Sequence, residues 1–118
     1  MRIDVITLFP GMFEGPLTES ILQRAREEDL LDLHFHDLRE FGLGEYRQVD
    51  DRPYGGGVGM LMRVDVAVSA IESVMALAPT EKMRRIYLSA RGETLMQSKV
   101  ESVATEYDRL ILLCGHYE

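Results

Sequence analysis

The chain has 118 residues, of which 46% are hydrophobic and 28% charged, and its formal net charge is -7. This length accommodates one domain with a single core and excludes a second domain. The acidic balance argues against strong nucleic-acid binding by this chain alone, because contacts from Lys and Arg to phosphate supply most of that affinity.

The start of the chain does not have the pattern of a targeting segment. Asp4 interrupts the first apolar residues, and no apolar run approaches the roughly 20 residues of a membrane span. We therefore expect a cytoplasmic protein with no membrane partner. The single cysteine, Cys114, follows an apolar run and is expected to be a small apolar residue at the end of a buried strand.

The first third of the chain predicts a strand, a helix and a second strand. Residues 2–9 are rich in Ile, Val and Leu and end at Pro10-Gly11, which is typical of a strand followed by a loop. Helical spacing of apolar residues predicts a helix over 17–28, with Thr18 as its cap. Alternation over 31–37 predicts a half-covered strand near a sheet edge.

The second half of the chain alternates helices with strands. A helix is predicted over 64–78, with its buried face formed by Val64, Val68, Ile71 and Met75. A strand over 84–89 and a short helix over 97–106 follow. Residues 109–114 are apolar on every side, as is typical of a central strand in a parallel sheet.

This element order predicts the α/β class, with helices flanking a mostly parallel sheet. Ligands of such sheets bind at the carboxyl ends of the strands. Three unusual stretches fall there, at residues 9–10, 88–92 and 114–118. Because the sequence stops directly after its most apolar strand, we expect a chain that is cut short.

Residues 49–62 form the least ordinary segment, in which two acids, an arginine and a tyrosine precede four glycines. Glycine costs backbone entropy on folding, so a cluster indicates a shaped loop with several φ values above zero and with N–H groups close to a ligand. Neither a P-loop nor a dinucleotide fingerprint fits, because Met60 follows Gly59 and charged residues precede the cluster. A flexible surface turn explains the glycines but not their charged neighbours.

Several of these stretches together closely resemble the bacterial tRNA (guanine-N1)-methyltransferase family (TrmD) of the SPOUT class. The resemblance rests on Leu8-Phe9-Pro10, Val49 to Gly57, Gly59 to Met62, Tyr87-Leu88-Ser89 and Cys114 to Glu118. It implies an α/β-knot fold and a homodimer. It also implies transfer of a methyl group from S-adenosylmethionine to N1 of the guanosine 3′ of the anticodon in tRNA, with Mg²⁺ dependence.

The resemblance further implies that this chain is incomplete. Members of the family continue beyond the Tyr117-Glu118 pair with the rest of a trefoil knot, a linker and a C-terminal domain. Those parts carry the aspartate general base, so no catalytic residue is expected within residues 1–118. We interpret the chain as the N-terminal part of a SPOUT methyltransferase domain that is inactive alone.

Two sets of site residues follow from matching the family's motifs. The set implied to border the cofactor is Tyr87, Leu88, Ser89, Gly115, Tyr117 and Glu118, and Gly115 would allow an adenine to approach closely. The set implied to contact the RNA substrate is Asp50, Arg52, Tyr54, Gly55, Gly56, Gly57, Gly59 and Glu118. Ala90 stands where the family commonly has proline, which predicts a less rigid loop.

Other interpretations remain open at this point. In one interpretation of Asp50 and Asp51, one aspartate orders its own loop and the other pairs with Arg52. In another, one of them acts as a base. His34 and His36 share a strand face and are interpreted as structural rather than as metal ligands. The alternative function is a non-catalytic nucleotide-binding or dimerising α/β module. A third possibility is a folding-defective fragment that pairs with another copy through residues 109–114.

Overall fold

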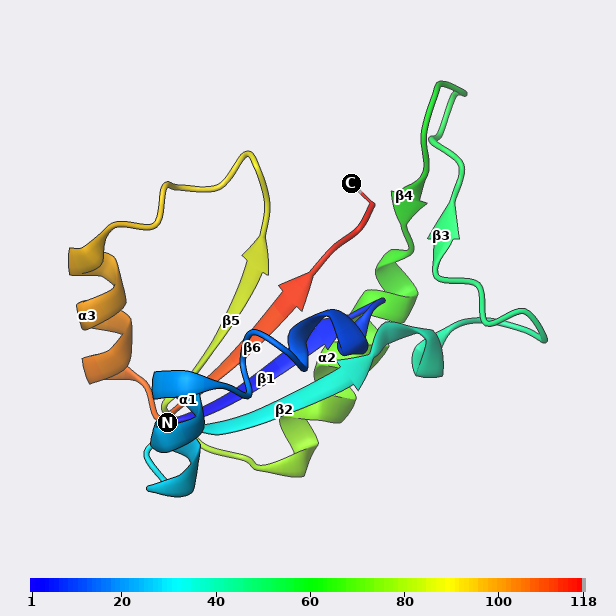
Figure 1. Ribbon diagram of the computed structural model, residues 1–118. Helices are drawn as coiled ribbons and strands as arrows, with labels where there is room; N and C mark the ends of the chain where they lie inside the picture. Colours follow the sequence, from blue (N-terminus) through cyan, green and yellow to red (C-terminus); the bar gives the residue numbers. More distant parts are fainter. Residues whose placement is uncertain (118) are drawn as a thin grey trace.

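A four-stranded parallel sheet with the order β2-β1-β6-β5 organises the computed structural model, which describes residues 1–117 (Figure 1). The strands are β1 (Arg2–Thr7), β2 (Asp32–Asp37), β5 (Met83–Leu88) and β6 (Arg109–Cys114). All three pairings are parallel, which confirms the predicted fold class. The predictions of β2 at an edge and β6 in the interior are also confirmed.

The strand register brings the carboxyl ends of all four strands level with one another. Thr7 lies opposite both Asp37 and Cys114, and Cys114 lies opposite Leu88. The loops that leave these four strand ends therefore meet along one rim of the sheet, where ligands of parallel sheets bind.

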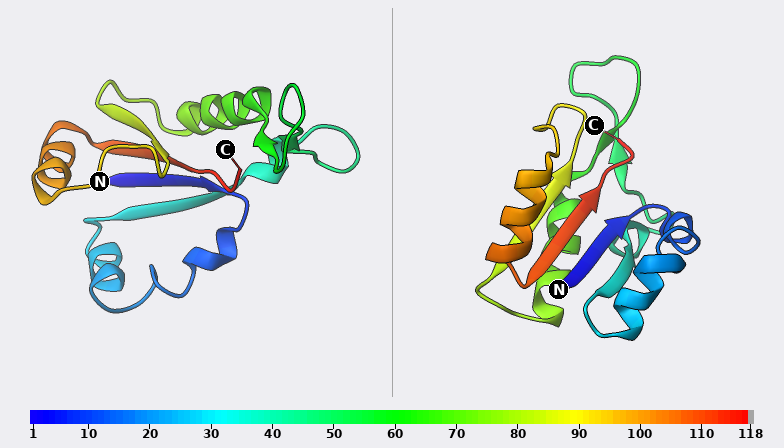
Figure 2. Two further views of the ribbon diagram at one scale, coloured as in Figure 1. Left: turned by 90° about the horizontal axis from the view of Figure 1, so that it is seen from above. Right: turned by 60° about the vertical axis from the view of Figure 1, so that its left-hand side comes forward.

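Helices α1 (Ser20–Glu27) and α2 (Val64–Leu77) lie on opposite faces of the sheet (Figure 2). Helix α3 (Gln97–Glu106) lies on the β5 side, and its bounds agree with the prediction. Two short 3₁₀ helices, η1 (Pro10–Phe13) and η2 (Leu38–Phe41), follow β1 and β2. A separate antiparallel pair, β3 (Asp50–Asp51) and β4 (Leu61–Met62), extends away from the sheet (Figure 1).

The prediction that Thr18 caps α1 is wrong. The helix begins at Ser20, and the N-cap residue Glu19 makes no capping hydrogen bond through its side chain. The Thr18 hydroxyl instead donates to the Glu14 carbonyl, within the turn that precedes the helix. A local hydrogen bond from the side chain thus competes with the capping role, as is common for threonine.

The predicted buried face of α2 is wrong in part. Its buried residues are Val66, Ala67, Ala70 and Val74, whereas Val64 is 75% exposed and Val68 44% exposed. The helix is apolar on more than one side, so periodicity alone did not select a face. The face with two alanines packs on the sheet, and the core that it forms includes Ile6, Leu8, Leu38, Val66, Val74, Ile111 and Leu113.

A buried ion pair joins the two central strands to α2. The Arg109 Nε donates to Asp4 Oδ2 at 2.8 Å, and both side chains are almost completely inaccessible to solvent. Arg109 also donates to the carbonyl oxygens of Val74, Met75 and Ala78 at the end of α2. A cation there complements the partial negative charge of the helix C-terminus.

Asp4 has two further partners that complete its coordination. Arg2 donates to both carboxylate oxygens at 2.9 Å, and His36 Nε2 lies 2.8 Å from Oδ1. Burial opposes ionisation of Asp4, but the hydrogen bonds from Arg2, His36 and Arg109 outweigh it and hold the pKa of this carboxyl well below its usual range. The carboxylate therefore stabilises the fold above its unfolded pKa of about 3.9, and this stabilisation is lost as the pH falls toward the folded-state value.

We expect Asp4→Asn to lower the free energy of unfolding by about 3–5 kcal/mol at pH 7, because Arg109 then remains buried without its counter-charge. Urea unfolding measures this change. The control is Asp32→Asn, which removes an exposed carboxylate at the start of β2 and should alter stability by less than about 0.5 kcal/mol. Below pH 4 the wild type should lose stability more steeply than Asp4→Asn. Equal stability of wild type and Asp4→Asn at pH 7 would contradict this role.

Candidate functional site

The loops that follow β5 and β6 enclose a hollow of about 350 Å³, which we call the rim hollow. Its volume is in the range of small-molecule sites. The residues that line it are Tyr87, Ser89, Ala90, Arg91, Gly115, His116 and Tyr117. Four predicted cofactor residues therefore lie together although they come from two distant segments of the sequence.

The two other predicted cofactor residues are placed differently. Leu88 ends β5, is half exposed and contributes to a neighbouring groove between β5 and α3 rather than to the rim hollow. Glu118 lies outside the described residues. The prediction that Leu88 and Glu118 contact a ligand thus stays a prediction.

The first loop of the rim hollow is a tight turn over Ser89–Gly92. The Gly92 N–H donates to the Ser89 carbonyl at 3.1 Å, and the Arg91 N–H donates to Ser89 Oγ at 3.2 Å. These two hydrogen bonds close the turn around Ala90. The Ser89 side chain therefore stabilises its own loop through this hydrogen bond.

In the second loop, Gly115 leaves room for the ring of Tyr87. A Cβ atom built on Gly115 would lie 3.1 Å from two atoms of the Tyr87 side chain and 3.3 Å from the Tyr117 carbonyl oxygen. The Tyr87 hydroxyl donates to that same carbonyl at 3.5 Å. Gly115 therefore permits the Tyr87 ring to approach closely, and this contact forms part of the wall of the rim hollow.

Aromatic rings continue along the rim beyond Gly115. Phe9, two residues after the end of β1, meets the His116 ring edge-on at 5.3 Å between centroids, and His116 meets Tyr117 at 5.2 Å. A second hollow, of about 260 Å³, lies between these loops and shares Gly115 and His116 with the rim hollow. Cys114 lines it, and burial raises the pKa of this thiol. The sequence places Phe9 in a strand-end stretch and in a family motif, but the predicted site residues do not include it.

The glycine-rich segment forms the tip of the hairpin between β3 and β4. Gly55, Gly56, Gly57 and Gly59 have φ values of 84°, 86°, 135° and 97°, which confirms the predicted left-handed backbone. Tyr54 is fully exposed at this tip. None of the predicted substrate residues that the structure describes lines the rim hollow. The hairpin is thus a separate part of the candidate site.

Asp51 anchors the base of this hairpin to α2. Its carboxylate lies 3.1 Å from Arg63 Nη1, and Arg63 also pairs with Asp65 at 3.0 Å. The Arg52 backbone N–H donates to Asp51 at 2.8 Å. For Asp51, the interpretation that it pairs with the Arg52 side chain is therefore wrong. The ion pair of Asp51 is with Arg63, because the pairing of β3 with β4 brings Arg63 alongside.

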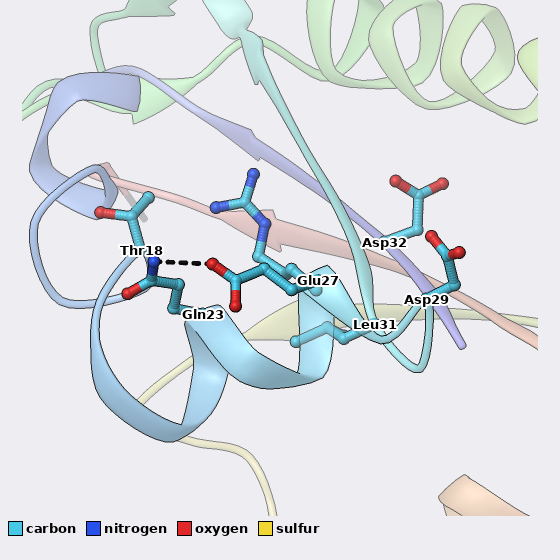
Figure 3. Close-up of a pocket in the computed structure, with 7 residues that line it drawn as sticks. Thr18, Gln23, Glu27, Asp29, Leu31 and Asp32 are labelled. Carbon is cyan, nitrogen blue, oxygen red and sulfur yellow. Dashed lines mark hydrogen bonds between the residues drawn. The ribbon is translucent and has the colours of Figure 1, made fainter.

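A further depression, of about 700 Å³, lies beside α1 and the start of β2, and Figure 3 shows its lining. Its lining is mostly polar, with Gln23 and Glu27 joined by a hydrogen bond of 2.8 Å. Asp29 and Asp32 extend from the segment where β2 begins. Most of the side chains that line this depression are exposed and polar, so we interpret it as part of the solvated surface.

Residues 1–117 show neither a metal-ligand cluster nor a membrane-spanning helix. In this range, no group of three or more His, Cys, Asp or Glu side chains is arranged to hold a metal ion. The nitrogen atoms of His34 and His36 lie 2.8 Å from Asp32 and Asp4, respectively. None of the described helices has the length and apolar character needed to cross a bilayer.

Comparisons with known proteins agree on one family. The family model described as tRNA (Guanine-1)-methyltransferase TrmD matches residues 1–118. Similar curated proteins are the tRNA (guanine-N(1)-)-methyltransferases of Chloroflexus aurantiacus and Geobacillus kaustophilus, 48% and 47% identical over all 118 residues. The same enzyme of Protochlamydia amoebophila is 48% identical. The chain spans about half the length of these relatives, at 46%, 47% and 51%.

We expect Gly115→Val to displace the Tyr87 ring and to lower the free energy of unfolding by about 1–3 kcal/mol, the usual effect of overpacking. Urea unfolding gives the energy, and the NMR signals of the Tyr87 ring report the displacement. In a Tyr87→Ala background the same substitution should cost much less, because the obstructing ring is gone. An equal cost in both backgrounds would refute the contact. Gly11→Val, at a position with no atom within 4 Å of a Cβ, is the control.

Proposed function

The chain belongs to the tRNA (guanine-1)-methyltransferase family, and on that premise we propose that it binds S-adenosylmethionine in the rim hollow for transfer of a methyl group to N1 of a guanosine in tRNA. The observation that carries the proposal is the convergence of Tyr87, Ser89, Gly115 and Tyr117 around one hollow. The target that we propose is the guanosine 3′ of the anticodon, as the family resemblance implies.

The residues of the rim hollow fit an adenosyl group. Adenine and ribose are commonly held by apolar contacts together with a few polar groups, and the lining offers the Tyr87 ring, the Ala90 methyl group and the loop backbone. Tyr87, Ser89, Gly115 and Tyr117 would hold the cofactor. When bound, S-adenosylmethionine supplies a methyl group on a positively charged sulfur, and these residues orient it for in-line attack.

A base has to accept the proton that N1 of guanine carries near neutral pH. The described lining of the rim hollow contains no carboxylate, and its imidazole, His116, packs against the Phe9 and Tyr117 rings, so we assign no catalytic residue within it. We propose that the base approaches from outside this hollow and that the 118 residues alone do not complete the reaction. Mg²⁺ dependence, which the family resemblance implies, stays a prediction, since residues 1–117 contain no group of three or more His, Cys, Asp or Glu side chains arranged to hold a metal ion.

We propose that the glycine hairpin contacts the RNA. The Asp50 carboxylate is suited to accept a hydrogen bond from the amino group of a guanine, and the exposed Tyr54 ring is suited to stack on a base. Arg52 and the N–H groups of the positive-φ glycines would face phosphate or base edges. A tRNA substrate and a homodimeric enzyme in the cytoplasm complete the proposal.

A non-catalytic nucleotide-binding module is the second candidate, favoured by the absence of a carboxylate from the described lining. Such a module would bind adenosine compounds in general, without selecting the sulfur-linked group. The two candidates therefore differ in ligand selectivity, which is directly measurable.

We expect calorimetric titration of the chain to show binding of S-adenosylmethionine and S-adenosylhomocysteine at least about tenfold tighter than binding of ATP, a difference of about 1.4 kcal/mol. The mass in solution, recorded alongside, shows whether the sample is an aggregate. Gly115→Val should abolish most of this binding. Equal affinity for all three ligands would favour the nucleotide-binding module and overturn the methyltransferase proposal for this hollow.

In the complete enzyme we expect Asp50→Ala to weaken binding of an anticodon stem-loop RNA by about tenfold, since one lost base contact costs about 1–3 kcal/mol. Affinity for S-adenosylmethionine should not change, because Asp50 does not line the rim hollow. Glu45→Ala is the control, since it removes the same charge from an exposed neighbouring loop. Parallel loss of RNA and cofactor affinity would contradict the substrate-side role of Asp50.

A further inference from the structure

Contacts run without interruption along the rim from the end of β2 toward the rim hollow. Asp37, the last residue of β2, accepts a hydrogen bond from the Arg39 N–H at 2.9 Å. The Arg39 side chain then crosses to the loop after β1, where Nη1 donates to the Leu8 carbonyl. The centre of its guanidinium lies 5.2 Å from the centroid of the Phe9 ring. Arg39 therefore holds both the backbone and the ring of this loop.

From Phe9 the contacts continue to the wall of the rim hollow. Phe9 meets the His116 ring at an interplanar angle of 81°, and His116 meets the Tyr117 ring at 79°. The Tyr117 carbonyl accepts the hydrogen bond of the Tyr87 hydroxyl. Three of these residues line the rim hollow, whereas Arg39 and Phe9 do not.

We propose that Arg39 is a positioning residue for the rim hollow, acting through Phe9 on His116 and thus on the loop of residues 115–117. Phe9 is 40% exposed, so burial alone does not fix its ring. The Arg39 guanidinium supplies the missing restraint, because it combines a charge-assisted hydrogen bond with a cation–π contact. The expected consequence for ligand affinity rests on the proposed binding of S-adenosylmethionine.

The test compares Arg39→Met with Arg84→Met. Methionine keeps an unbranched apolar side chain but removes the charge and the hydrogen-bond donors. Arg84 is the matched control because its guanidinium lies 5.8 Å from the Tyr107 ring, in the same kind of contact but away from the rim hollow lining. We expect Arg39→Met to weaken S-adenosylmethionine binding by about tenfold, the loss of one charge-assisted hydrogen bond. Arg84→Met should stay within about twofold of wild type.

A double-mutant cycle separates positioning through Phe9 from a general structural effect. Phe9→Leu alone should weaken binding about as much as Arg39→Met, and the two together no more than either one, because both break the same chain of contacts. Losses that multiply in the double variant would overturn the route through Phe9. Should Arg39→Met fail to fold, Arg39→Lys, which keeps the charge but not the planar fork, takes its place and is expected to weaken binding by a smaller factor.

A second measurement needs no cofactor. The nuclear Overhauser effect between the Phe9 and His116 rings should be present in the wild type and in Arg84→Met, and lost in Arg39→Met at an unchanged unfolding temperature. Its persistence in Arg39→Met would overturn the inference. If the wild type binds no S-adenosylmethionine, the proposed cofactor function of this chain fails, and the ring-to-ring signal still decides the role of Arg39.

Discussion

The ion pair between Asp4 and Arg109 is the constraint on which the remaining structure depends. Two buried charges are tolerated only when each finds its partners, and here the carboxylate has three cationic or imidazole partners while the guanidinium closes the end of α2. A shift of β6 against β1 by one residue would move Arg109 to the other face of the sheet, away from Asp4 and from the carbonyl oxygens of α2. The pair therefore fixes the register of the central strands and the position of the helix that covers them.

This register also determines where the loops of the site lie, at the carboxyl ends of the strands. Because Thr7, Cys114 and Leu88 are level with one another, the loops after β1, β6 and β5 emerge side by side. Gly115 then decides how closely two of these loops approach, since any side chain there would meet Tyr87. The amino half of the sheet thus supplies stability through charge, and the carboxyl half supplies a hollow shaped by aromatic rings and a glycine.

The glycine hairpin is held in place by different interactions from those that form the rim hollow. Its ladder has only two residue pairs, and its tip relies on glycines with positive φ rather than on packing. The ion pairs of Arg63 with Asp51 and Asp65 join its base to the first turn of α2. Under the proposed function, the rim hollow would hold the small ligand and the protruding, anchored hairpin would contact the RNA.

The sequence by itself determined those structural features that depend on residues close together along the chain. The bounds of α3 and β6, the interior place of β6 and the positive φ of the glycines follow from local periodicity, apolar runs and backbone sterics. Family motifs at the strand ends also located most of the rim hollow. Only the tertiary structure decided which face of α2 is buried, that Asp51 pairs with Arg63, and that Asp4 meets Arg109 across 105 positions of sequence. Such partners are set by strand register and helix docking, which bring distant residues together and leave no trace in local sequence patterns.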